Sequence, residues 1–143
     1  MTRVVVSRDM PASPSVVWAA LADLESHPVW MRDARSVAFT SDQTSGVGTR
    51  MEVATVIGPF RTTDVMEVVS WEEGRSIGVV HQGLVTGRGT LSLDSGTVPT
   101  TVTWDETLTF PWWLGGAVTA WLARPVLAAV WRGNLRRLED SLG

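Results

Sequence analysis

Apolar and polar residues alternate over several separate stretches of the chain, which is the pattern of half-buried β-strands. In the first stretch, residues 3–10, Val4, Val6 and Met10 share one parity. Six further runs rich in valine and threonine follow, at residues 35–41, 48–58, 60–72, 75–83, 84–94 and 100–110. The short segments at the ends of these runs (TSGVG, IGPF, WEEGR, HQG and DSGTVP) suit hairpin turns. The runs therefore predict an antiparallel meander.

Helical spacing replaces alternation directly after the first strand. Ser13 is a suitable N-cap and Pro14 suits the first helical position. His27 and Pro28 break this helix, and the residues PVWM indicate one further short turn. The apolar stripe of the helix consists of Val17, Trp18, Leu21 and Leu24.

The chain ends in a long predicted helix, from about Leu114 to Leu142. Pro125 is expected to kink it and separates two apolar stripes that are offset by roughly a third of a turn. The first stripe is Leu114, Val118, Trp121 and Leu122, and the second is Leu127, Trp131, Leu135, Leu138 and Leu142. An antiparallel sheet must cover its apolar face, and this helix is the only predicted element large enough. The expected fold class is α+β, with seven antiparallel strands, two short helices after the first strand and one long C-terminal helix.

The stretch from Phe110 to Trp131 holds one charge in 22 residues and raises the question of a membrane span. An arginine near the centre of a spanning helix costs about 2.5–3.5 kcal/mol, and each Leu, Val or Phe returns only about 0.3–0.6 kcal/mol. Arg124 therefore cancels most of the gain, and insertion comes out near zero. We expect the stretch to pack against protein, with no stable membrane insertion.

Composition narrows the class of protein further. A chain of 143 residues suits one domain, taken here as residues 1–143. A net charge of −3 and a pI near 5.3 argue against a nucleic-acid partner. The chain has no cysteine, and its first ten residues lack the apolar core of a secretory signal, so a cytoplasmic location is expected.

The sequence resembles the START/Bet v1-like (SRPBCC) superfamily, and within it the bacterial polyketide cyclase/dehydrase-like group. The resemblance rests on PASPSVVWAALADLESHPVWM near the start, on GVGTRMEV and MEVVSWEEGRSI in the middle, and on NLRRLEDSL at the end. It implies a helix-grip fold, in which the sheet curls around the long helix and leaves an apolar cavity between them. It implies no obligatory metal or cofactor, and none is expected.

Glu106 is the most unusual residue of the last strand. Parity sends it inward with Val102, Trp104 and Leu108. A carboxylate there must be paired, hydrogen-bonded or protonated. Arg124 at the kink is the first candidate partner, and the alternative is that Arg124 extends to solvent.

The other candidate site residues lie on neighbouring strands and on the aromatic positions. His81 shares its parity with Ile77 and Val79, and is either a core residue or a site residue. Gly87 and Gly89 have two interpretations that do not exclude one another: they leave room in the cavity, and they let the sheet bend. Met51 and four tryptophans complete the ligand-binding candidates, namely Trp30, Trp104, Trp113 and Trp121. Two histidines and no cysteine make a His-based metal site very unfavourable.

Two functions follow from this reading. The first is binding, sequestration or transport of a small hydrophobic molecule, lipid-like or polyketide-like, by a monomer or homodimer. The second is a metal-independent enzyme of the polyketide cyclase, aromatase or dehydrase type, in which Glu106 or His81 moves protons. A polar pair deep in the cavity would favour the enzyme, because an acid or base must lie within about 3 Å of the proton it transfers.

Overall fold

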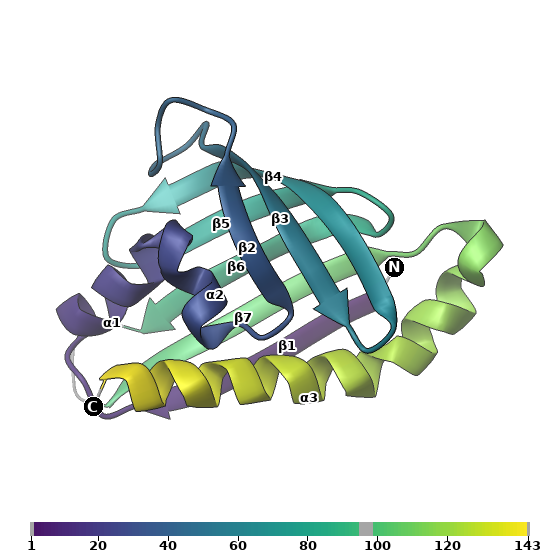
Figure 1. Ribbon diagram of the computed structural model, residues 1–143. Helices are drawn as coiled ribbons and strands as arrows, with labels where there is room; N and C mark the ends of the chain where they lie inside the picture. The colour runs from purple at the N-terminus through teal and green to yellow at the C-terminus, as the bar shows by residue number, and fades with distance from the viewer. Residues whose placement is uncertain (1, 95–98, 143) are drawn as a thin grey trace.

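The computed structural model describes residues 2–94 and 99–142 and contains the predicted antiparallel sheet (Figure 1). Its seven strands follow the order β1-β7-β6-β5-β4-β3-β2, and every neighbouring pair is antiparallel. Their bounds are β1 Thr2–Met10, β2 Ala34–Phe39, β3 Arg50–Ile57, β4 Phe60–Glu72, β5 Ser76–Gln82, β6 Thr86–Asp94 and β7 Thr100–Thr109. The sequence thus predicted each strand to within a few residues. Of the predicted turn DSGTVP, residues 95–98 lie outside the described residues.

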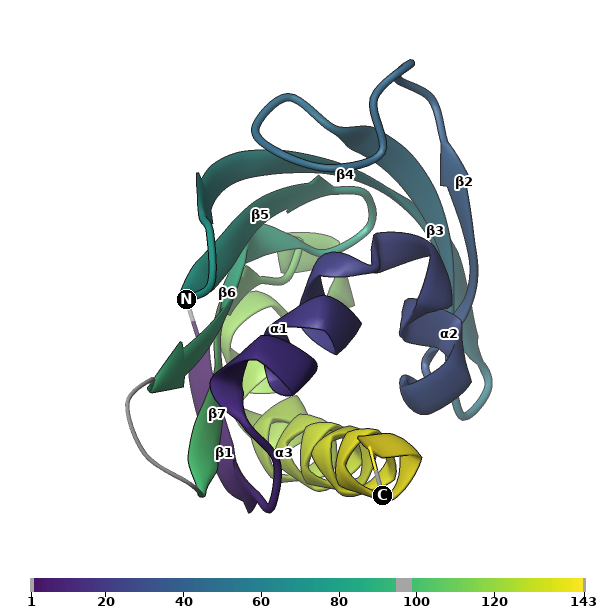
Figure 2. The same cartoon turned by 90° about the vertical axis from the view of Figure 1, so that its left-hand side faces the viewer.

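Two short α-helices follow the first strand, as expected. They are α1, Pro14–Ala22, and α2, His27–Trp30, joined by a 3₁₀ turn, Leu24–Ser26. Figure 2 shows the sheet arching from β1 and β7 over to β3 and β2, with all three α-helices on its concave side. Register shifts in β2 and in β4, between Val68 and Ser70, help the sheet to curl. This is the helix-grip arrangement.

The long helix α3 spans Gly116–Leu142 and starts two residues later than predicted. Trp112–Leu114 instead form a 3₁₀ turn, and Gly115 and Gly116 both have positive φ (93° and 51°), which ends that turn before the helix begins. Pro125 lies inside α3, and the first half of the helix bends away from the line of the second half (Figure 1).

One of the two apolar stripes of α3 is buried, and the other is exposed to solvent. The second stripe packs on the sheet, with Leu127, Trp131, Leu135 and Leu138 at most 7% exposed. The first stripe lies at the surface, where Val118, Trp121 and Leu122 are 60–70% exposed. None of the helices in the described part of the chain combines the length and apolar character needed to cross a bilayer.

Candidate functional site

A cavity of about 320 Å³ lies between the concave face of the sheet and α3. Strands β2 to β7 and the segment around α2 form its walls, and α3 closes one side with Thr119, Ala123, Val126, Leu127 and Trp131. Most of the lining is aliphatic or aromatic. Five of its residues carry carboxylate or imidazole groups, namely His27, Asp33, Asp64, His81 and Glu106, and the ring of His27 is engaged by the backbone oxygen of Leu21.

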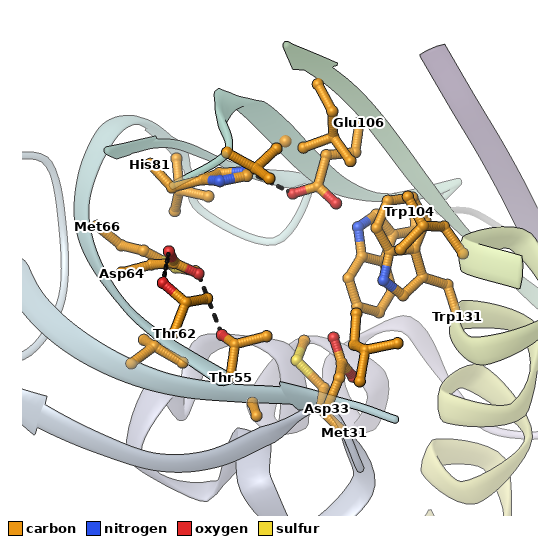
Figure 3. A pocket seen from close by; sticks show the side chains of 18 of the residues that line it. Met31, Asp33, Thr55, Thr62, Asp64, Met66, His81, Trp104, Glu106 and Trp131 are labelled. Carbon is orange, nitrogen blue, oxygen red and sulfur yellow. Dashed lines mark hydrogen bonds and ion pairs between the residues drawn. The ribbon is translucent and has the colours of Figure 1, made fainter. Parts of the chain in front are cut away.

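A histidine–glutamate pair lies in the wall of this cavity. His81 Nε2 is 2.7 Å from Glu106 Oε1, and both residues are buried, at 7% and 8% exposed (Figure 3). The inward parity predicted for both residues is confirmed by this burial. The expected partner was wrong, however, because Glu106 meets His81 of β5 rather than Arg124 of α3.

The sheet register explains how two residues that are not on neighbouring strands can meet. Strand β6 separates β5 from β7, and its Gly89 lies directly opposite Glu106. A Cβ atom at Gly89 would come within 2.9 Å of Glu106 Oε1. The missing side chain of Gly89 therefore leaves the space through which the Glu106 carboxylate reaches toward His81.

The protonated form of His81 is favoured by its surroundings. Burial lowers its pKa, but the hydrogen bond and charge of Glu106, the charge of Asp64 and a backbone hydrogen bond at Val85 outweigh burial and raise the pKa above its ordinary value. The raised pKa favours the imidazolium form of His81, and the contact with Glu106 gives this buried group a hydrogen-bonded partner.

Asp64 on β4 is a third ionisable group in the cavity, and the sequence analysis missed it. It is 7% exposed, and Thr55 and Thr62 donate hydrogen bonds to its oxygens at 3.1 and 3.4 Å. Burial raises its pKa, and these hydrogen bonds and the charge of His81 offset that effect only in part. The available signal was parity, because Asp64 alternates inward with Met66 and Val68 along a run rich in valine and threonine.

Stacked tryptophans form another part of the wall. Trp104 of β7 lines the cavity and stacks on Trp131 of α3, with ring centroids 5.1 Å apart and planes 14° apart. Trp30 meets Trp104 edge to face at 6.3 Å, but it lies behind the lining, and its Nε1 has no hydrogen-bond partner among the described residues. Trp131 was assigned to the apolar stripe and not to the site. Met51, also expected at the site, does line the cavity.

The remaining candidates lie elsewhere. Trp113 and Trp121 are 60% and 70% exposed, and Arg124 lies in a shallow surface groove beside Val4 and Val5 of β1. The helix bend at Pro125 explains the position of Arg124, because a residue before the bend no longer shares a helix face with Trp131, which lies after it. Gly87 does not line the cavity. A Cβ atom at Gly87 would overlap the backbone oxygen of Thr107 on the neighbouring strand. Its role is to permit close contact between β6 and β7.

Within residues 2–94 and 99–142, no cluster of three or more histidine, cysteine, aspartate or glutamate residues could hold a metal ion. The arrangement instead offers an apolar chamber with a few polar groups at one side. Such a chamber can hold a small molecule by shape and can orient it through hydrogen bonds to Asp64, His81 or Glu106.

Solved structures share this fold. The chain is similar to the protein TTHA0849 from Thermus thermophilus, with 20% identity, a TM-score of 0.78, and coverage of 98% of this chain and 96% of that one. It is similar to major latex-like protein 151 from Panax ginseng, with 12% identity, a TM-score of 0.74, and coverage of 97% and 95%. It also matches DynU16, a protein in the dynemicin biosynthetic locus, with 19% identity and a TM-score of 0.71, covering 99% of this chain but 47% of that one. At these identities the likeness concerns the fold alone.

Sequence comparison is more specific about the family. No curated protein sequence matches the chain significantly. The family model described as polyketide cyclase / dehydrase and lipid transport matches residues 1–143, the whole length of the chain. The protein therefore belongs to this polyketide cyclase/dehydrase and lipid transport family, within the Bet v1-like (SRPBCC) group.

Proposed function

We propose that the protein binds a small, mostly apolar molecule in the cavity and presents it to the polar groups of β4, β5 and β7. The observation that supports this proposal best is the cavity itself, whose volume of about 320 Å³ falls in the range of small-molecule sites. Its apolar lining would provide affinity, while Asp64 and the His81–Glu106 pair would select a ligand that carries a hydroxyl or carbonyl group.

A lipid-like or polyketide-like molecule fits this description, and the family description names both lipid transport and polyketide chemistry. Sequestration or transport needs only the cavity and an entrance. The cytoplasmic location expected from the sequence remains part of the proposal.

The test is to introduce a large side chain on the cavity face of β5. The same side chain on the opposite face of β5 serves as the control. Val79 lines the cavity, whereas its neighbour Val80 does not and has the opposite parity on β5. We expect Val79→Trp to weaken binding of an apolar fluorescent probe about tenfold or more, because the indole would occupy space that the ligand needs. Val80→Trp should bind the probe as the wild type does. Native mass spectrometry of the wild type should show a retained apolar molecule. Equal probe binding by the two folded variants would contradict the proposal.

A second candidate function, acid–base catalysis, is favoured by one specific observation. A buried ionisable pair faces an apolar chamber, with Asp64 nearby. Glu106 would accept a proton from a carbon next to a ligand carbonyl, and the adjacent imidazolium would stabilise the negative charge that develops. Asp64, with its raised pKa, would donate a hydrogen bond or a proton to the carbonyl oxygen.

Deuterium exchange separates catalysis from binding. In deuterated buffer, an enzyme should speed exchange of the α-protons of an aryl ketone such as 1-tetralone. Glu106→Gln should slow this exchange about a hundredfold or more, while the Kd for the apolar probe changes little. If Glu106→Gln lowers the melting temperature and leaves both exchange and probe binding unchanged, the pair is structural and the protein is a carrier.

A further inference from the structure

Exposed apolar side chains gather where the chain leaves β7 and enters α3. Trp112 and Trp113 of the 3₁₀ turn are 86% and 60% exposed. Val118, Trp121 and Leu122 follow at helical spacing on one face of α3 and are 66%, 70% and 60% exposed. We call these five residues the tryptophan face. Isolated exposed apolar residues are ordinary, but five of them within 11 residues of sequence, three of which are tryptophans, indicate an interaction surface.

The cavity reaches solvent next to the tryptophan face. Val126 continues the same helix face by one turn and lines the cavity, yet it is 52% exposed. Phe60, at the tip of the β3–β4 hairpin, also lines the cavity and is 46% exposed. Phe60 and Val126 thus border the opening of the cavity to solvent, which we call its mouth.

The charges along the sequence that follows β7 have one sign, although the whole chain carries a net charge of −3. The sequence has no acidic residue between Glu106 and Glu139, and the charged residues in that interval are Arg124, Arg132, Arg136 and Arg137. Arg61 follows Phe60 in the hairpin. In the described part of the chain, neither Arg61 nor Arg124 takes part in an ion pair, and both are exposed.

From this combination we infer that the tryptophan face docks on the surface of an anionic lipid bilayer, with the mouth of the cavity toward the membrane. Tryptophan favours the membrane interface, because its ring is apolar and its N–H can remain hydrated. Arginines beside an apolar helix face are attracted to anionic headgroups. Docking of this kind is peripheral and reversible, as expected for a helix too polar to span.

A second copy of this chain would be a poorer partner for the same surface. In a two-fold symmetric dimer the patch would meet itself, and Arg61 and Arg124 of each copy would approach their counterparts. The sequence of α3 supplies no acidic residue before Glu139 to compensate them. Docking on a membrane does not depend on the proposed function. Passage of a ligand between the membrane and the cavity, through the mouth, does rest on the proposed function.

Vesicle co-sedimentation tests the inference directly. We expect the full chain to bind vesicles of equal parts phosphatidylcholine and phosphatidylglycerol, and to bind pure phosphatidylcholine more weakly. Trp121→Gln/Leu122→Gln should lower the partition coefficient about tenfold or more, because two interfacial side chains are lost. Arg124→Gln should lower it about fivefold on the anionic vesicles and little on the neutral ones.

The matched control is Val16→Gln/Val29→Gln, which removes two exposed apolar residues from α1 and α2. This control should bind vesicles as the wild type does. Circular dichroism and cavity-probe binding should be unchanged in all these variants, so loss of docking is distinguishable from loss of the fold or the cavity. Absence of wild-type binding to anionic vesicles, or equal losses in control and test variants, would overturn the inference. So would a wild-type dimer, seen by light scattering, that Trp121→Gln/Leu122→Gln splits without changing vesicle binding.

Discussion

At the scale of single residues, the His81–Glu106 pair is the feature that most shapes the site. Two glycines of β6 contribute in different ways, since Gly89 leaves room for the Glu106 carboxylate and Gly87 lets the strands approach. The pair concentrates charge on one side of an otherwise apolar chamber. Its chemistry therefore affects the stability of the fold around it and, on the proposed function, the kind of ligand that the chamber would accept.

The raised pKa of His81 makes the stability of the protein depend on pH. The folded chain holds the imidazolium proton to a higher pH than the unfolded chain, whose histidine has a pKa of about 6.5. The stabilising contribution is complete below that value and is lost as pH rises through the folded-state pKa. We expect His81→Gln to lower the melting temperature more at about pH 5.5 than at about pH 9. Thermal melts at both values test this, and an equal difference at the two pH values would contradict it.

Substitution of Asp64 should raise the melting temperature, whereas substitution of His81 should lower it. Because burial raises its pKa, ionised Asp64 costs stability in the folded chain. That cost develops above the unfolded-state pKa of about 3.9, as pH rises through the higher folded-state value. Asp64→Asn should therefore raise the melting temperature by a few degrees at about pH 7 and by less at about pH 4. A melting temperature that falls at the higher pH would show that the charge of Asp64 stabilises the fold.

At the scale of elements, α3 has two halves with separate tasks. The second half is fixed to the segment after α2 by the fully buried Asn134, whose Nδ2 donates to Asp33 Oδ1 at 2.6 Å. Its Oδ1 accepts from the backbone N–H of Arg32 at 3.1 Å and also from Arg137. The first half, before Pro125, carries three of the five residues of the tryptophan face and closes the cavity with small residues. The bend thus divides the helix into an anchored part and a surface part.

This division predicts different costs for substitutions along one helix. Asn134→Ala should lower the free energy of unfolding by about 1–3 kcal/mol, because it leaves buried partners of Asn134 without hydrogen bonds. Leu122→Ala, at a position that is 60% exposed, should change it by no more than about 0.5 kcal/mol. Urea unfolding of both variants measures these costs. Similar losses would mean that the first half of α3 is packed as tightly as the second.

At the scale of the whole molecule, the proposed ligand binding would make stability depend on occupancy of the cavity. A ligand that binds only the folded state stabilises it by about 2.7 kcal/mol at a hundred times its Kd. Removing a retained apolar molecule by organic extraction and refolding should therefore lower the melting temperature of the wild type. The same treatment should leave Val79→Trp unchanged, because its cavity is filled. An equal decrease in both proteins would attribute the effect to the extraction itself.

Much of the fold followed from the sequence because the decisive signals are local. Alternation with a period of two identifies a strand and selects its buried face, which placed Glu106 and His81 inward. Glycine, proline and aspartate at the turns predicted hairpins and hence an antiparallel order. The site was harder, because its residues come from separate strands. Asp64 had the right parity but no neighbour in the sequence that indicated a site.

The sequence alone determined which segments form strands and helices and which face of each strand is apolar, because these depend on residues a few positions apart. The tertiary structure decided which buried charges meet. His81 and Glu106 lie 25 residues apart, and they pair because the sheet register and the absent Cβ of Gly89 bring their side chains together across β6. The tertiary structure also decided that Trp113 and Trp121 face solvent. Their exposure depends on the direction in which α3 leaves the sheet, which Gly115, Gly116 and Pro125 set together.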